Sequence, residues 1–384
     1  MFEKLISRLF KRSRASNAAD NDKGVSNNTV NTAANPQQNN KRKLANSTEK
    51  TSDNIVESYD IPIPTRTVNI SVASLNRLDF LFYDYLLGPS QTSTTLNPIE
   101  QYILTRVNHA LKSPDSVLTH FPVLPQSVIS LTNLLNNPDF NLQSFIKVVE
   151  QEPSIATELM KKANSPAYKR GDKDITNLQQ AFMFMGANDI KEFVLNRFIK
   201  NLCQQKPIYF KTFGEKIWLH SQDVAIVAKT LAARRKQNAD AAYTIGLMHD
   251  LGKVVIFQFM VEAFKMIDPD FKQDSLVFKK FLSEKSMLLS VELMKIWNMP
   301  SVIIDVVQGQ VEDITNVDDL DPMTAILFEA NLISEISLSY QDGHIQPAEF
   351  ESLVSNTKLR GDAKLLLREI LNIYSDEASS SCIT

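Results

Sequence analysis

Cysteine, glycine, net charge and long hydrophobic runs are all scarce in this sequence. Only Cys203 and Cys382 are cysteines among 384 residues, which excludes a disulfide scaffold and favours a reducing, cytoplasmic setting. The net charge of -3 gives no indication of nucleic-acid binding. Apolar runs such as Val254–Val261 are too short to span a membrane. With ten glycines and few two-residue alternations, the sequence predicts an all-α protein rather than a barrel, a sandwich or a doubly wound sheet.

The N-terminal third of the chain divides into three parts. Residues 1–14 place apolar residues on one face of a helix and lysines and arginines on the other. Such a helix could lie on an anionic membrane surface or dock in a partner's groove, or it could be a frayed, solvated terminus. Residues 15–56 are polar and are expected to form a disordered linker. Residues 57–120 are interpreted as a small helical extension without visible chemistry, with helices over Leu78–Gly88 and Pro98–Leu111.

Short amphipathic segments separated by capping residues follow in residues 121–205. Asn141 and Thr176 are predicted to cap helices there, and Gly186 is predicted to end one. The pattern predicts a packed bundle of about five short helices.

A second helical lobe is predicted to begin near Lys211 with a long helix, Phe213–Gln237. The helices expected after it are Ala239–His249, Val254–Phe264, Asp274–Glu284, Ser286–Asn298, Val302–Val311 and Pro322–Tyr340. In residues 341–384, the helices Pro347–Ser355 and Asp362–Tyr374 are expected to precede a frayed tail.

His249 and Asp250 are adjacent between two strongly apolar runs. Both side chains lose hydration when buried, so they require a metal, another cation or each other as partner. His220 lies on the preceding long helix, and two antiparallel helices could bring the three side chains together. Imidazole and carboxylate groups are suitable ligands for Zn, Fe, Mn or Ni.

Several short motifs around these residues occur in a fixed order. They are Leu124-Pro125, Glu152-Pro153, Lys162-Ala163-Asn164-Ser165, Gln180-Ala181 with Met185-Gly186, Trp218-Leu219-His220-Ser221, Gly246-Leu247-Met248-His249-Asp250-Leu251-Gly252-Lys253 and Trp297-Asn298-Met299-Pro300. With these motifs, residues 121–340 resemble the HDOD domain, the HD-related output domain of bacterial signalling proteins. The resemblance implies an all-α, two-lobed fold, with an N-terminal helical lobe over 121–205 and an HD-like lobe over 211–340.

The chain departs from the ligand set that the resemblance implies for active HD and HD-GYP phosphodiesterases. Ser286–Ser290 and Gln310-Val311 stand where such enzymes carry further histidines, and Asn331 stands where they carry the last aspartate. The basic HD ligands that remain are His220, His249 and Asp250. This excludes a binuclear site, leaves a vacant or mononuclear Fe, Mn or Zn site as the alternative, and favours no catalytic residue and no cofactor.

A structural role is therefore the favoured interpretation of these side chains. Asp250 would accept a hydrogen bond from an imidazole, and the buried cluster would fix the register of two helices. Lys253 could pair with Asp250 or with Glu329, or its side chain could end in solvent.

Other polar and apolar groups also have structural explanations. Phe182–Met185 is interpreted as core rather than as a cofactor pocket. Arg234–Lys236 is expected to face the dipole of its helix. His109 and His120 have no acidic or cysteine partner at ligand spacing and are expected to be structural or exposed.

These features favour a non-enzymatic signalling module that binds protein partners. By the resemblance, the partners would be signalling proteins such as histidine kinases or cyclic-dinucleotide enzymes. The chain shows no receiver, cyclase or phosphodiesterase pattern, so we expect it to act in trans, in the cytoplasm or at a membrane through residues 1–14. A metal-dependent phosphohydrolase acting on a nucleotide or cyclic dinucleotide, and a nucleotide sensor without turnover, are the alternatives.

Overall fold

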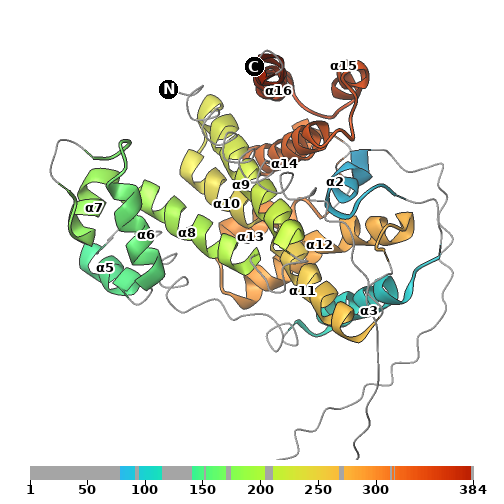
Figure 1. Cartoon of the computed structure of the whole chain (residues 1–384), viewed down its shortest axis with the longest axis horizontal. Helices are drawn as coiled ribbons and strands as arrows, with labels where there is room; N and C mark the ends of the chain where they lie inside the picture. The colour runs from blue at the N-terminus through green and yellow to red at the C-terminus, as the bar shows by residue number, and fades with distance from the viewer. Residues whose placement is uncertain are drawn as a thin grey trace, which may run out of the picture. The chain divides into compact units, whose positions relative to one another are not determined.

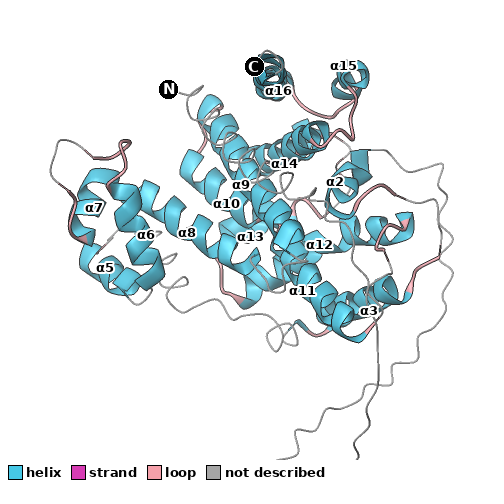
Figure 2. Ribbon diagram, viewed as in Figure 1, coloured by secondary structure: helices cyan, strands magenta, loops and turns pink. Residues whose placement is uncertain are grey.

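The computed structural model describes residues 78–90, 95–114, 141–150, 153–169, 174–203, 211–267, 272–311, 314 and 316–381. Across these ranges the regular secondary structure is helical and no β-strand element occurs, which confirms the all-α prediction (Figure 2). The predicted basic helix over 1–14, the linker over 15–56 and the helix after Pro125 lie outside the described residues.

The N-terminal lobe contains four described helices, α5 (Leu142–Glu150), α6 (Pro153–Ala163), α7 (Leu178–Met185) and α8 (Ala187–Cys203). Asn141 accepts hydrogen bonds from the backbone of the first turn of α5, as predicted. The cap of α7 is Asn177, which accepts from Gln180 N, so the prediction of Thr176 was wrong by one residue. Gly186 ends α7 with a φ of 82°, a conformation that favours glycine.

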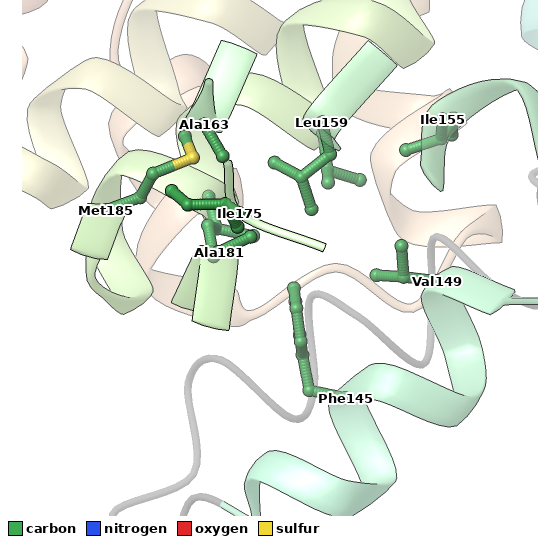
Figure 3. Close-up of a cluster of buried hydrophobic side chains, with 10 residues drawn as sticks. Phe145, Val149, Ile155, Leu159, Ala163, Ile175, Ala181 and Met185 are labelled. Atoms are coloured by element: carbon green, nitrogen blue, oxygen red, sulfur yellow. The ribbon is translucent and has the colours of Figure 1, made fainter. Parts of the chain in front are cut away.

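The core of this lobe is apolar (Figure 3). Phe145 of α5, Leu159 of α6 and Ala181 of α7 are among its fully buried members. Phe182 and Met185 pack in this cluster, but Met183 and Phe184 are 75% and 39% exposed, so only half of the Phe182–Met185 run is core.

The second lobe is arranged around the long helix α9 (Lys211–Arg234). α10 (Ala239–Met248) and α14 (Pro322–Gln341) pack along α9 (Figure 1). α11 (Leu251–Met266) packs against α12 (Leu276–Ile296), and α13 (Ser301–Gln308) packs on α12 and α14.

Helix α12 corrects the prediction of two helices over this stretch. Ser275 caps it by accepting a hydrogen bond from Phe278 N, and the helix then continues unbroken to Ile296. No glycine or proline interrupts the segment, and Ser286 and Ser290 are buried inside it.

The turn between α10 and α11 carries His249 and Asp250. By length and composition alone, Ala239–Met266 could cross a membrane, but 94% of its apolar window is buried inside the fold. A Cβ on Gly246 would lie 2.8 Å from Ala225 Cα, and one on Gly252 would lie 1.8 Å from Ser286 O. The two glycines beside this turn therefore permit close packing of α10 on α9 and of α11 on α12.

Helices α2 (Leu78–Leu87) and α3 (Pro98–Lys112) precede the N-terminal lobe in sequence but pack on the second lobe. α2 contacts α9, α12 and α14, and α3 contacts α11 and α12. Buried Glu100 accepts hydrogen bonds from Ser275 N and Oγ at 3.0 and 2.8 Å. Lys279 of α12 bonds Asp84 Oδ1 at 2.7 Å.

Two further helices, α15 (Pro347–Ser355) and α16 (Gly361–Ser381), follow α14. α16 packs on α14 and continues past Tyr374, where the sequence pattern predicted its end.

Candidate functional site

Four predicted side chains meet where α9, the α10–α11 turn and α14 come together. Asp250 Oδ2 lies 3.0 Å from His220 Nε2 and 3.3 Å from His249 Nε2. Asn331 Oδ1 lies 3.1 Å from His220 Nε2 and 3.0 Å from His249 Nε2. His220 and His249 are fully buried, Asp250 is 1% exposed, and Asn331 is half-buried. We call these four residues together with Lys253 the histidine–aspartate centre.

Each imidazole is also held from its outer side. His249 Nδ1 lies 2.7 Å from the carbonyl of Gly246, which can only accept, so Nδ1 carries a proton. His220 Nδ1 lies 3.0 Å from Ser334 Oγ on α14. These contacts fix both ring planes, as outer partners do for histidines at metal sites.

Lys253 pairs with Asp250, so the structure selects one of the partners left open by the sequence. Its Nζ lies 2.5 Å from Asp250 Oδ2, and the residue is only 6% exposed. Glu329, the alternative partner, is fully buried and instead binds Arg235 and Arg360.

Helix α2 covers the centre. The ring of Phe82 lies 4.1 Å from that of His220 between centroids, and Lys253 Nζ lies 4.7 Å from the Phe82 centroid. Tyr83 Oη lies 3.2 Å from Ser286 Oγ, in the segment where the resemblance implies a further histidine in active HD enzymes. The sequence predicted residues 57–120 only as a small helical extension without visible chemistry, and the structure adds that α2 of this extension lies against the centre. The signal was present in the sequence, because α2 is apolar on nearly all sides and such helices are buried.

The electrostatics of the centre follow from burial and short contacts. Burial lowers the pKa of His220 to about 4 against the opposing effect of Asp250, so this imidazole is neutral at pH 7. Burial alone would raise the pKa of Asp250, but His249, Lys253 and His220 outweigh it and hold that pKa well below its usual range. Burial also disfavours the ammonium of Lys253, yet the Asp250 carboxylate raises its pKa above the usual value. Asp250 and Lys253 are therefore a charged, buried pair.

In shape, the donor atoms fit a single metal ion. Two borderline imidazole nitrogens with a hard carboxylate oxygen and a hard amide oxygen form a mixed ligand set of the kind that Zn, Fe or Mn accept. Asp250 Oδ1 is buried and accepts no hydrogen bond from the described residues.

In charge, the same atoms do not fit a divalent ion. The charge of Asp250 is already matched by Lys253, whose ammonium lies against Oδ2, the carboxylate oxygen that also contacts both imidazoles. Residue 331 contributes a neutral amide instead of a second carboxylate. A divalent ion would therefore add unmatched positive charge to a buried site.

The positions that would serve a second metal have other roles. Ser290 Oγ accepts a hydrogen bond from Gly252 N at 2.8 Å, and Gln310 Nε2 donates to Thr324 O at 2.9 Å. His109 is exposed, and His120 lies outside the described residues. The structure thus brings together the four residual HD positions. Within the part of the chain that it describes, it places no ligands for a second metal beside them.

The Arg234–Lys236 cluster has partners beyond its helix dipole. Arg235 bonds Glu329 Oε2 at 2.5 Å and Asp362 at 2.8 Å, and Arg234 bonds Glu369 at 2.7 Å. These ion pairs join α9 to α14 and α16, so the dipole explanation was incomplete.

The sequence and the fold are both similar to those of known proteins. The model of the HDOD domain family matches residues 121–312, which is half of the 384-residue chain. The crystal structure of an HDOD domain protein with unknown function from Geobacter sulfurreducens has the same fold, with a TM-score of 0.51 and 21% identity over 71% of this chain and 95% of that chain.

Two sequence relatives match parts of the chain. Ribonuclease Y of Mesoplasma florum is 28% identical over 118 residues, 31% of this chain and 19% of that protein. An uncharacterized protein of Treponema pallidum is 20% identical over 251 residues, 64% of this chain and 47% of that protein. The chain therefore spans less than half the length of either relative.

Proposed function

Because this chain belongs to the HDOD domain family, we propose that it is a non-catalytic signal-transduction module that acts by binding protein partners. The observation that carries the proposal is the buried Lys253–Asp250 pair beneath Phe82. A hydrolytic metal site needs an open position where water can bind and lose a proton. Here an ammonium and an aromatic ring lie against the ligand side chains instead.

The partners we propose are signalling proteins acting in trans, such as histidine kinases or enzymes of cyclic-dinucleotide metabolism. The chain would work in the cytoplasm, with residues 1–14 as a means of reaching an anionic membrane surface. Affinity capture from the native host with the full chain, followed by binding measurements with the purified partner, tests this part. A signalling protein that binds equally well to wild type and to Asp250→Asn would support docking independent of the centre.

The convergence of His220, His249 and Asp250 within 4.8 Å favours a second candidate, a metal-dependent phosphohydrolase. The discriminating experiment measures hydrolysis of a model phosphodiester and of cyclic dinucleotides with added Mn²⁺, Fe²⁺ or Zn²⁺. We expect the wild-type rate to equal that of His249→Ala. A metal-dependent rate that disappears in His249→Ala would replace the proposed function with the enzymatic one.

A further inference from the structure

We propose that Lys253 is the resident cation of the histidine–aspartate centre and keeps a divalent metal out of it. The inference deepens the proposed function, because it explains how HD-type side chains can stay together without metal chemistry. It is distinct from the loss of the carboxylate at position 331, which is visible in the sequence. The structure adds that another residue supplies the positive charge.

The position of Lys253 carries the inference. Lys253 lies in the first turn of α11, three residues after Asp250, so the helix itself directs the ammonium to the carboxylate. Its Nζ contacts Asp250 Oδ2, the same oxygen that lies 3.0 Å from His220 Nε2 and 3.3 Å from His249 Nε2. A metal bound by both imidazoles and this oxygen would therefore share its ligand with the ammonium.

Helix α2 encloses the ammonium on another side. Lys253 Nζ lies 4.7 Å from the ring centroid of Phe82 and 5.8 Å from that of Tyr83. The negative faces of aromatic rings stabilise a cation that has lost water. Phe82 and Tyr83 are 1% and 5% exposed and Lys253 is 6% exposed, so the ammonium is held among buried groups rather than in solvent.

The charges around the centre agree with a monovalent occupant. Asp250 and Lys253 cancel each other, and Asn331 adds no charge. The half-buried carboxyl of Glu335, which accepts a hydrogen bond from Asn331 Nδ2 at 3.2 Å, is the other acidic group facing the centre from α14. If Glu335 is ionised, a divalent ion together with Lys253 would still outweigh the two carboxylates and leave a net positive charge among buried groups. Lys253 without a metal leaves no such excess.

The chain offers a matched control for testing this role. Lys279 of α12 is also fully buried and also binds a carboxylate, Asp84, and its other partners are Gly88 O and Ser90 Oγ. Lys253→Met and Lys279→Met each remove one buried ammonium and keep a side chain of similar length. Only Lys253→Met should open the centre to a metal.

The experiment measures metal content of the full chain after incubation with Zn²⁺ or Mn²⁺ and desalting, by elemental mass spectrometry, together with thermal unfolding. We expect wild type and Lys279→Met to retain less than about 0.1 equivalents and Lys253→Met to retain about one equivalent. Metal should raise the Tm of Lys253→Met by about 5 °C and leave that of wild type unchanged. His249→Ala added to Lys253→Met should abolish the uptake.

Stoichiometric metal in the wild type, or a folded Lys253→Met that takes up none, would overturn the assignment. If Lys253→Met does not fold, Asn331→Asp decides, because it restores a carboxylate while retaining Lys253. Low metal content in that variant supports the role of Lys253, and one equivalent refutes it. Metal uptake by wild type without phosphodiester hydrolysis would contradict this inference and leave the proposed function standing. Metal-dependent hydrolysis by wild type would contradict the proposed function.

Discussion

The core of the N-terminal lobe consists of aliphatic and aromatic side chains, whereas the core beneath α9 contains charged and polar groups. In the first, Phe145 and Leu159 are buried among other apolar residues. In the second, Asp250 and Lys253 are buried as an ion pair against two imidazoles. The side chains compared are buried in both regions, so the comparison isolates what different interior chemistry does to stability.

An apolar core depends on volume, and each side chain contributes in proportion to the surface it buries. A polar core depends on complete pairing, because a buried polar or charged group that loses its hydrogen-bond or ion-pair partner destabilises the fold. The two lobes should therefore respond differently to substitution. Conservative changes of shape should be tolerated in the first, and loss of one partner should be costly in the second.

The largest effect is expected for Asp250→Ala. This change leaves the Lys253 ammonium buried without its carboxylate and removes the acceptor of His220. We expect a loss of about 3–5 kcal/mol in the free energy of unfolding. Urea unfolding followed by circular dichroism measures it. Asp305→Ala, on the exposed side of α13, is the control and should change stability by less than about 0.5 kcal/mol.

In the N-terminal lobe, Leu159→Ala should cost about 3 kcal/mol, because the residue is fully buried and its removal leaves a cavity. Leu159→Met keeps most of the volume and should cost less than about 1.5 kcal/mol. The same unfolding experiment compares the two variants. Equal losses for both would show that this core does not depend on volume as the comparison requires.

The same contrast explains how much could be predicted from the sequence. Helix positions and the apolar lobe follow from local periodicity and capping residues, so α10 and α14 were placed within one residue of their ends. The family motifs also identified His220, His249 and Asp250, and the ligand set that the resemblance implies identified Asn331. Helix α12 was divided wrongly because the polar residues 283–286 resemble a break, although Ser286 is buried inside a continuous helix.

The contribution of α2 could not be predicted in the same way. Its apolar surface indicates that it is buried, but the sequence does not say against which helix. The contact between Phe82 and His220 joins residues far apart in the chain. The partner of Lys253 was likewise undecided, because Asp250 and Glu329 are both plausible from spacing alone. Only the packing of Glu329 on Arg235 and Arg360 settles the choice.

The pH dependence of the free energy of unfolding tests the polar core through His220. Burial lowers the pKa of this histidine to about 4, whereas it is 6.5 in the unfolded chain. Between these values the unfolded state binds more protons, so stability falls as pH falls through this window. Between about pH 7 and 5, we expect the free energy of unfolding of wild type to fall by about 2 kcal/mol more than that of His220→Gln. Parallel pH profiles for the two proteins would show that the histidine is not held neutral.

The smallest effect is expected at Asp223, one turn after His220 on α9. Burial raises the pKa of this half-buried carboxyl to about 7, from 3.8. A raised carboxyl pKa means that the folded state favours the protonated form, so stability is lost as pH rises from about 4 through 7. Asp223→Asn removes the charge that the fold disfavours. Because the side chain is partly solvated, we expect a gain of only about 1 kcal/mol at about pH 8 and no gain at about pH 4. Urea unfolding at both pH values measures this difference, and a gain that is the same at both would mean that the carboxyl is not destabilised by its charge.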